Sequence, residues 1–396
     1  MNKFILFLLL LLSYSCININ NFDRGYLEKR IQDTVEVPFE SYRGLIILEA
    51  KFNGVEGKFL FDNGASYSCV NQDFAEKAGI KFKQGSSISD GNNRKTTVKE
   101  STAKDIAIDK IHFKNTGVYL IDTKNFFPCK EDVDGILGAS VINKINWLID
   151  FKGEKIQISS SAFNNDGISF PISFSSNNSS FMTFELNDFP VRAKIDFGYQ
   201  GDLKLREGEY KHKFSGMKVD KSVGISSLSI SGLGKNDTTY DIHNGIEMRI
   251  DNIRLPYPPE INLTKNLKYK ARIGTDFFRN YELVVNSSEK EYLLKAYEEE
   301  FDTEDYRAYG VAIYKVEESY RIIQLKPSLI KDQPIEIMDE VISINEKSVD
   351  SFSDFCALRE FLAKSREEAE TLYLRIKGKE LSFTFPYQKA ELISLP

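Results

Sequence analysis

The most constraining feature of this 396-residue sequence is an Asp-x-Gly segment that occurs twice, each time after an apolar run. In the first copy Phe59-Leu-Phe leads into Asp62, and in the second Ala193-Lys-Ile leads into Asp196. An apolar run ending this way is typical of a buried strand that delivers a carboxylate to a tight loop, where glycine permits close backbone approach. One copy alone would indicate only an ordinary turn, because Asp and Gly punctuate most loops.

Other landmarks recur at matched spacing around the two aspartates. An asparagine lies nine residues before each aspartate, a glycine follows each by 76 or 78 residues, and a polar residue that ends an apolar run lies twelve residues beyond each glycine. The pairs are Asn53 and Asn187, Asp62 and Asp196, Gly138 and Gly274, and Asp150 and Asn286. These pairs indicate internal duplication of a roughly 130-residue unit rich in β-strand patterns.

The composition limits the possible functions. Hydrophobic residues make up 41% of the chain, enough for large cores, and the length favours two or three domains. A net charge of −6, with both signs mixed, argues against a nucleic-acid partner, because neutralising phosphates requires a basic face. The histidines are far apart and in no metal-ligand spacing: His112, His212 and His243. We therefore expect neither a metal nor another cofactor.

The N-terminus has the pattern of an export signal. Lys3 is followed by an apolar run over residues 4–12, too short for a membrane span, and then by Cys16. A cysteine at this place resembles a bacterial lipoprotein signal, which implies lipidation of Cys16 and a membrane anchor that does not span the bilayer. The alternative is an ordinary cysteine after a standard signal. We expect residues 1–16 to be the signal peptide and residues 17–35 a tether, with the body facing the periplasm or the cell surface.

Three cysteines remain beyond the signal, at Cys69, Cys129 and Cys356. The odd number leaves at least one of them unpaired within the chain. A bridge between Cys69 and Cys129 is possible, but spacing does not establish it. No histidine lies near any of them in sequence, so a cysteine nucleophile has little local support.

The rest of the chain divides into two lobes and a smaller C-terminal part. Residues 36–162 and 163–297 each hold one copy of the duplicated unit. The acidic residues 298–305 predict a linker, because such runs are usually solvated. Residues 306–396 combine short apolar runs with a helical pattern over 351–364, which predicts a small α+β domain.

A hairpin is predicted over residues 86–99, about thirty residues past Asp62. Its tip is Asp90-Gly91-Asn92, flanked by β-forming residues, and such a tip is typical of a β-hairpin. We expect this hairpin to lie over a cleft between the lobes.

Two Asp-x-Gly loops from related lobes can converge on one site. Two carboxylates about 3 Å apart cannot both ionise easily, so Asp62 and Asp196 would share a proton and split their pKa values. One then takes a proton from water as general base, and the other donates to the scissile carbonyl as general acid. This chemistry requires no metal and no nucleophilic side chain.

At this point the sequence resembles the pepsin/retropepsin-like aspartyl proteases, in the two-lobed bacterial lipoprotein variety with a C-terminal PDZ domain. The first active-site loop is Asp62-Asn63-Gly64-Ala65-Ser66, and the second is Asp196-Phe197-Gly198. Ile136-Leu-Gly138 and Ile273-Gly274 match the elements that pack behind these loops. The resemblance covers about residues 36–297 for the protease and 306–396 for the PDZ domain.

The resemblance implies a mainly β fold, with two related pepsin-like β-barrel lobes that form a cleft, followed by a small α+β PDZ-like domain. It also implies that Asp62 and Asp196 are the catalytic pair and that residues 86–99 form the substrate-covering flap. This sequence departs from the family at Asn63 and Phe197, where Thr or Ser is usual and its hydroxyl locks the two loops together. The flap tip also lacks the tyrosine of pepsin.

The C-terminal part carries the PDZ resemblance. Tyr309-Gly310-Val311-Ala312 is similar to the loop and strand with which PDZ domains bind a peptide. Such domains add a peptide strand to a sheet edge and hold its carboxylate with backbone amides. The alternative is a helper subdomain whose groove is covered by its own chain.

The resemblance therefore predicts a membrane-anchored aspartic endopeptidase that cleaves a peptide or protein substrate, with the PDZ domain recruiting or regulating it. A second interpretation is an inactive protease-like lipoprotein that binds peptides or another ligand, because Asn63 and Phe197 depart from the family pattern. A third is a glycosidase pair, whose carboxyls lie roughly 5–10 Å apart.

Overall fold

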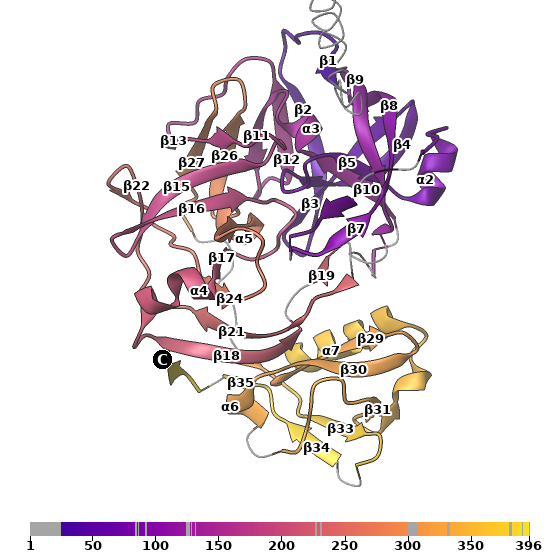
Figure 1. Ribbon diagram of the computed structural model, residues 1–396, viewed down its shortest axis with the longest axis vertical. Helices are drawn as coiled ribbons and strands as arrows, with labels where there is room; N and C mark the ends of the chain where they lie inside the picture. Colours follow the sequence, from indigo (N-terminus) through magenta and orange to yellow (C-terminus); the bar gives the residue numbers. More distant parts are fainter. Residues whose placement is uncertain are drawn as a thin grey trace, which may run out of the picture.

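The computed structural model describes residues 25–395, except for residues 84, 86, 92, 124–126, 128, 131, 226, 227, 230, 231, 300–306, 331, 332, 380, 381 and 390. The predicted signal peptide, Cys16 and Asn92 therefore lie outside the described residues, as does most of the predicted linker. The fold is mainly β, with two large mixed sheets and a few helices (Figure 1). Within the described part of the chain, no helix is both long and apolar enough to cross a membrane.

The first lobe is a closed barrel. Each strand pairs with the next, and the last returns to the first, in the order β3 (Leu45–Phe52), β4 (Val55–Asp62), β10 (Val133–Gly138), β5 (Ser68–Val70), β9 (Ile111–Leu120) and β8 (Lys99–Ile108). The run that ends at Asp62 is buried, as predicted, because β4 lies between β3 and β10 and is covered on both faces.

The second lobe repeats this arrangement strand by strand. Its order is β15 (Ser180–Leu186), β16 (Phe189–Ile195), β25 (Ala271–Ile273), β17 (Leu203–Arg206), β24 (Ile261–Thr264) and β21 (Asn236–Ile242). Antiparallel and parallel pairings alternate along this path as they do in the first lobe, so the duplication seen in the sequence is also a duplication of topology. The second lobe differs at its closure, where β21 pairs with β18 (Lys218–Ile225), and β22 (Met248–Ile250) pairs with β15.

The two lobes share a sheet. Its central strands are β11 (Asn146–Asp150) and β26 (Tyr281–Asn286), which pair antiparallel, with β12 (Lys155–Ser159) and β2 (Val35–Tyr42) on one side and β27 (Glu291–Ala296) and β13 (Ile168–Pro171) on the other. The predicted apolar runs before Asp150 and Asn286 are these central strands. Trp147 is fully buried there, and its indole N–H donates to the Ile142 carbonyl at 2.7 Å. The lobes are therefore held together by one continuous core.

Residues 25–35, expected to be part of the tether, instead pack on the first lobe. β1 (Tyr26–Leu27) pairs with β9, and the Ile31 amide donates to Ser160 Oγ at 2.9 Å. Leu27 and Ile31 lie against the hydrophobic core, which explains why this stretch is ordered against the lobe.

The C-terminal part has its own hydrophobic core. It contains β29 (Val311–Val316), β30 (Ser319–Leu325), β31 (Val341–Ile344), β33 (Leu372–Ile376), β34 (Ser382–Phe385) and α7 (Phe355–Glu367). The α7 helix begins after Asp354, whose carboxylate accepts from the amides of Cys356 and Ala357, both at 2.8 Å. The β30 strand pairs with β18, so the sheet of the second lobe continues into this domain at the bottom of Figure 1.

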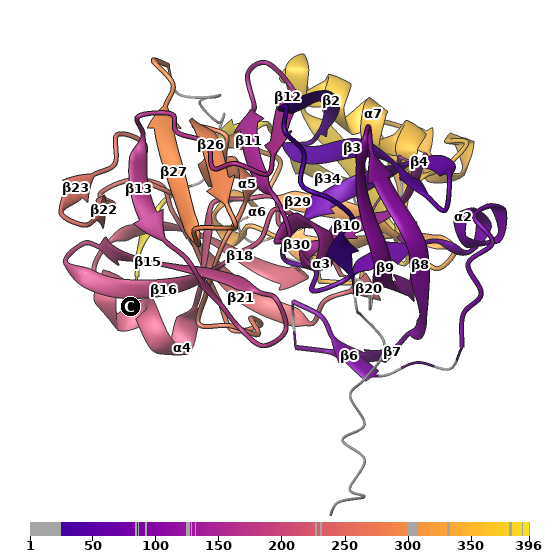
Figure 2. The ribbon, with the colours of Figure 1, turned by 90° about the horizontal axis from the view of Figure 1, so that it is seen from above.

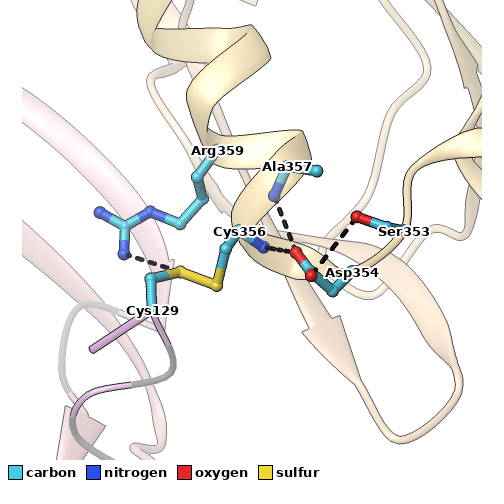
Figure 3. The surroundings of a disulfide bond; sticks show 6 residues. All are labelled: Cys129, Ser353, Asp354, Cys356, Ala357 and Arg359. Atoms are coloured by element: carbon cyan, nitrogen blue, oxygen red, sulfur yellow. Dashed lines mark hydrogen bonds between the residues drawn. A yellow bond between two sulfur atoms is a disulfide. The ribbon is translucent and has the colours of Figure 1, made fainter. Parts of the chain in front are cut away.

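A disulfide joins the first lobe to this domain. Cys129 pairs with Cys356 at the start of α7, with a Cα–Cα distance of 5.3 Å, and Arg359 lies beside Cys129 (Figure 3). The bridge between Cys69 and Cys129 that spacing allowed is therefore not formed. Cys69 is buried in β5 in a cluster with Ile47, Leu60 and Ile136, whereas Cys129 packs against the core of the C-terminal domain.

Candidate active site

Each aspartate lies at the end of a strand, beside a parallel strand that leads into a glycine. Asp62 is opposite Gly138 in the β4–β10 register, and the Asp196 amide donates to the Ile273 carbonyl at 3.0 Å. A side chain at Gly138 or Gly274 would overlap the backbone of the loop that follows each aspartate. The two glycines of the repeat therefore let these loops cross closely over the neighbouring strands.

The two loops converge. Oδ1 of Asp62 accepts from the amides of Gly64 at 2.7 Å and Ala65 at 3.2 Å in its own loop, and from Gly198 at 3.1 Å in the opposite loop. A methyl group on Gly198 would overlap the Asp62 carboxyl, and one on Gly64 would overlap Oδ1 of Asp196. Each carboxyl thus occupies the space left by the glycine of the other loop, and the duplication places both acids in one site.

The departure at Asn63 is compensated by its amide group. Asn63 is fully buried, and its Oδ1 accepts from the Phe197 backbone N–H at 2.9 Å. Its Nδ2 donates to Ser180 Oγ at 3.1 Å and to Tyr292 Oη at 3.3 Å. Asn63 therefore links the two loops in the way expected of a hydroxyl side chain.

The departure at Phe197 is compensated by packing. Its ring is fully buried, with centroids 5.9 Å from Phe61 and 5.4 Å from Phe278. The expected hydroxyl link from this side is absent, and an aromatic contact between the lobes stands in its place. Aromatic pairs of this kind contribute about 0.5–1.5 kcal/mol beyond the burial of their area.

Burial changes the ionisation of Asp62. Both aspartates are only 8% exposed. Burial, and next the charge of Asp196, raises the pKa of Asp62 to about 7, although Lys194 and the loop amides oppose the rise. Asp62 is therefore protonated in about half of the molecules near pH 7.

Two cations that the sequence analysis did not single out approach the pair. Lys194 donates from Nζ to the Gly64 carbonyl at 2.6 Å. Nη1 of Arg272 lies 3.5 Å from Oδ2 of Asp196. Both residues come from the strands that carry the second motif, β16 and β25, and they face each other in the register. The sequence does contain a signal for these two residues, because each basic residue stands between two buried apolar residues of its strand. Side chains alternate between the two faces of a strand, so each basic side chain is expected on the face opposite its apolar neighbours.

The predicted hairpin is present and reaches the second lobe. It consists of β6 (Ser87–Ser89) and β7 (Lys95–Thr97), with the turn held by the Arg94 amide, which donates to Oδ1 of Asp90 at 2.8 Å. The Gly91 carbonyl accepts from the Lys268 amide at 3.1 Å, and a methyl group on Gly91 would lie 2.7 Å from Nη1 of Arg272. The tip therefore covers the Asp196 side of the site.

A second hairpin, which the sequence analysis missed, meets the first. It is formed by β19 (Leu228–Ser229) and β20 (Gly232–Leu233), and it lies beside β6 and β7 in Figure 1 and Figure 2. The Arg94 guanidinium donates to the Leu233 carbonyl at 2.5 Å and to the Gly232 carbonyl at 2.8 Å, and the Ser229 hydroxyl donates to Asp90 at 2.6 Å. The internal duplication could have predicted this second hairpin, because the two hairpins occupy similar places in the two copies. Asp90 follows Asp62 by 28 residues, and Ser229 follows Asp196 by 33.

The remaining predicted residues lie away from the aspartates. Tyr309 is buried and packs on Tyr387, with ring centroids 5.2 Å apart. Gly310 has φ +81°, and its carbonyl accepts from the Lys326 amide at 2.8 Å. Val311 and Ala312 begin β29, which ends its sheet and pairs, among the described strands, only with β30.

Ala65 and Ser66 complete the first loop. Their carbonyls accept from the amides of Ala139 at 2.8 Å and Ser140 at 3.1 Å, in the short helix α3 (Ala139–Ile142) that follows Gly138. These bonds tie the Asp62 loop to the element behind it. Within the described residues, no group of three or more His, Cys, Asp or Glu side chains is arranged to hold a metal ion.

Comparisons with known proteins identify part of the chain. No curated protein matches it. A solved structure of a retropepsin-like aspartic protease from Rickettsia conorii is similar over 33% of this chain and 94% of that chain, with 21% identity and a TM-score of 0.24. Residues 48–141 match the family model described as "Aspartyl protease". This stretch, which includes Asp62 and its loop, is therefore an aspartyl protease domain.

Proposed function

We propose that the protein is an aspartic endopeptidase in which Asp62 and Asp196 activate water between them. The observation that carries the proposal is the reciprocal fit of the two loops: the Gly198 amide donates to Asp62, and the Asp196 carboxyl lies against Gly64. Such a fit positions two acids from duplicated elements on one reacting group.

The hydrogen bonds of the Asp62 carboxyl support this chemistry. Three backbone amides donate to Oδ1 of Asp62, so in the proposed reaction the proton of this carboxyl is assigned to Oδ2. In the proposed reaction, Asp196 takes a proton from water while the water oxygen bonds to the carbonyl carbon. Asp62 gives its proton to the carbonyl oxygen.

Breakdown of the resulting gem-diol restores the enzyme. The C–N bond breaks as the nitrogen takes the proton held by Asp196, and a gem-diol hydroxyl returns a proton to Asp62. The sum is hydrolysis of one peptide bond by one water. The Gly198 and Gly64 contacts keep both carboxyls in place during these transfers.

Substrate access requires the two hairpins to part. Arg94 and Asp90 of the first hairpin bind the second hairpin directly, and both aspartates are nearly inaccessible beneath them. A peptide would lie extended under the hairpins once these contacts open, and reclosure would exclude water from the site.

We further propose that residues 306–396 are a PDZ-like domain that recruits or regulates the substrate. Among the described strands β29 pairs only with β30, which supports the addition of a peptide strand at its other edge, and Gly310 directly precedes β29. The pairing of β30 with β18 links this edge to the strand that leads into the second hairpin.

We also propose that the protein is an exported lipoprotein, anchored through Cys16 and facing the periplasm or the cell surface. The pairing of Cys129 with Cys356 supports an oxidising compartment, because structural disulfides are rare in the reducing cytosol.

The second candidate function is ligand binding without cleavage. It is favoured by the contact of Arg272 with Asp196, which gives Asp196 a cationic partner and so disfavours a proton shared with Asp62. The two candidates predict different outcomes for the same substrates.

Cleavage of a peptide library, followed by mass spectrometry, tests the proposal. The variants are Asp62→Asn and Asp196→Asn, and the matched control is Asp188→Asn, whose side chain is 86% exposed. We expect the wild type and the control to cleave the same peptides and both site variants to lose about 10³-fold or more in rate. Equal cleavage by wild type and Asp62→Asn would refute the pair, and peptide binding without cleavage by the wild type would establish the second candidate.

A further inference from the structure

Three basic residues form a row across neighbouring strands of the second lobe. Lys194 on β16 faces Arg272 on β25, and Arg272 faces Lys204 on β17. Directly paired residues project from the same face of a sheet, so the three side chains share one face. It is the face of the cleft, because Arg272 reaches Asp196 and lies under Gly91 of the first hairpin.

The Lys204 side chain is buried, and its ammonium has no acceptor among the described residues. Lys204 is 6% exposed, and no hydrogen bond or ion pair from its Nζ is formed among the described residues. Lys204 Nζ lies over the Tyr199 ring, 5.3 Å from the ring centroid. A largely desolvated cation without a paired anion gains from an anionic partner, which the described part of the chain does not supply.

Arg272 lies on the same ring. Its guanidinium is 4.1 Å from the Tyr199 centroid, and its Nε is buried without an acceptor. Both cations therefore contact Tyr199, which lies in the second active-site loop, three residues after Asp196. A planar guanidinium with unused donors is suited to a carboxylate.

The nearest acids are already engaged. Oδ2 of Asp237 accepts from the amides of Lys265 at 2.9 Å and Asn266 at 3.2 Å, and Asp241 accepts from the side chain of Asn262. Burial, followed by the charge of Arg272, lowers the pKa of Lys204 to about 8, with Asp241 and Asp237 opposing. Most Lys204 side chains therefore remain charged at neutral pH and lack a direct counter-ion.

We propose that Lys204 and Arg272, which pair across two strands and both contact the Tyr199 ring, form a carboxylate-binding subsite that selects peptides with Asp or Glu beside the scissile bond. Arg272 lies within 3.5 Å of Asp196 Oδ2, and an extended peptide advances about 3.3 Å per residue, so the acidic residue directly flanks the cleaved bond. On binding, the substrate carboxylate takes up the donors of Arg272 and Lys204. This subsite deepens the proposed endopeptidase function and rests on it.

The test uses two peptides that differ only in Glu or Gln next to the cleaved bond. With the wild-type protein, we expect kcat/KM to be roughly 10- to 100-fold higher for the Glu peptide, the range of a buried charge-assisted contact. Lys204→Met should abolish most of this ratio. Lys204→Arg should retain the preference, and Lys204→Glu should shift it toward a Lys peptide.

Controls separate the subsite from the proposed reaction. Lys295→Gln removes an exposed lysine of the same lobe and should leave the ratio unchanged. Dissociation constants of the same two peptides, measured by calorimetry with the Asp62→Asn protein, report the subsite without cleavage. A failure to cleave either peptide, with tighter binding of the Glu peptide that depends on Lys204, would refute the endopeptidase and keep the subsite. Equal cleavage and equal binding of both peptides by the wild type would overturn the subsite.

Discussion

The side chain of Asn63 accepts a hydrogen bond from the backbone N–H of Phe197 at 2.9 Å, and both residues are fully buried. Asn63→Ala leaves this N–H unpaired and removes the hydrogen bonds from Asn63 to Tyr292 and Ser180, so we expect a loss of about 2–4 kcal/mol in the free energy of unfolding. Asn63→Thr supplies one acceptor, so it should lower the free energy of unfolding by less than Asn63→Ala does. Denaturant titration measures both, with exposed Asn236→Ala as the control. Equal stabilities for Asn63→Ala and Asn236→Ala would contradict the link.

The proton on Asp62 makes stability depend on pH. Its pKa of about 7 in the folded state is above the value near 4 of an unfolded aspartate, so the folded state binds the proton more tightly. This contribution is complete below about pH 4 and is lost as the pH rises to about 7. We expect wild type, compared with Asp62→Asn, to lose about 2–4 kcal/mol in the free energy of unfolding between pH 4 and pH 8. Parallel pH profiles for the two proteins would exclude the raised pKa.

The glycines of the two loops tolerate no side chain. A methyl group on Gly198 would overlap the Asp62 carboxyl, and we expect Gly198→Ala to lower kcat at least about 100-fold by displacing it. Gly208→Ala is the control, because nothing lies within 4 Å of the added atom. Gly208→Ala should keep full activity and gain up to about 1 kcal/mol in stability, since alanine is the better helix residue. A fully active Gly198→Ala protein would show that the loops relax independently.

Arg94 holds the two hairpins together. Replacing it with methionine removes its bonds to Leu233, Gly232 and Ser229, and we expect amide hydrogen exchange over β6, β7, β19 and β20 to become about tenfold faster. Lys95→Met is the control, because Lys95 is exposed on the same hairpin. If both variants exchange at the wild-type rate, the hairpins are held by other contacts.

Reduction of the disulfide should loosen the C-terminal domain. Cys129 and Cys356 are 227 residues apart, and loss of a native disulfide typically costs about 2–5 kcal/mol. We expect dithiothreitol to lower the urea midpoint of the wild type but not that of Cys356→Ser. Cys69→Ala should keep the sensitivity to dithiothreitol, because Cys69 is unpaired. A midpoint independent of reductant in the wild type would contradict the bridge.

Local patterns predicted much of this protein. The matched spacings of Asp62 with Gly138 and of Asp196 with Gly274 indicated a duplicated β unit, and the two lobes repeat the same strand pairings. The hairpin near Asp90 was also predicted, because turn residues and β-forming neighbours are short-range signals. These features depend on interactions between residues that are near in sequence or repeated at a fixed period.

The contacts of the site residues could not be predicted in this way, because they join residues that are far apart in the sequence. Nothing near Asn63 in sequence indicates that it bonds to Phe197, and nothing near Cys129 indicates that it reaches Cys356. The row formed by Lys194, Arg272 and Lys204 comes from three strands that are brought into register by the folded sheet. The order of residues was enough to predict two acids on a duplicated scaffold. Their environment, a buried Asp62 with a raised pKa and an Asp196 beside Arg272, depends on desolvation and charge contacts that exist only when distant segments pack together.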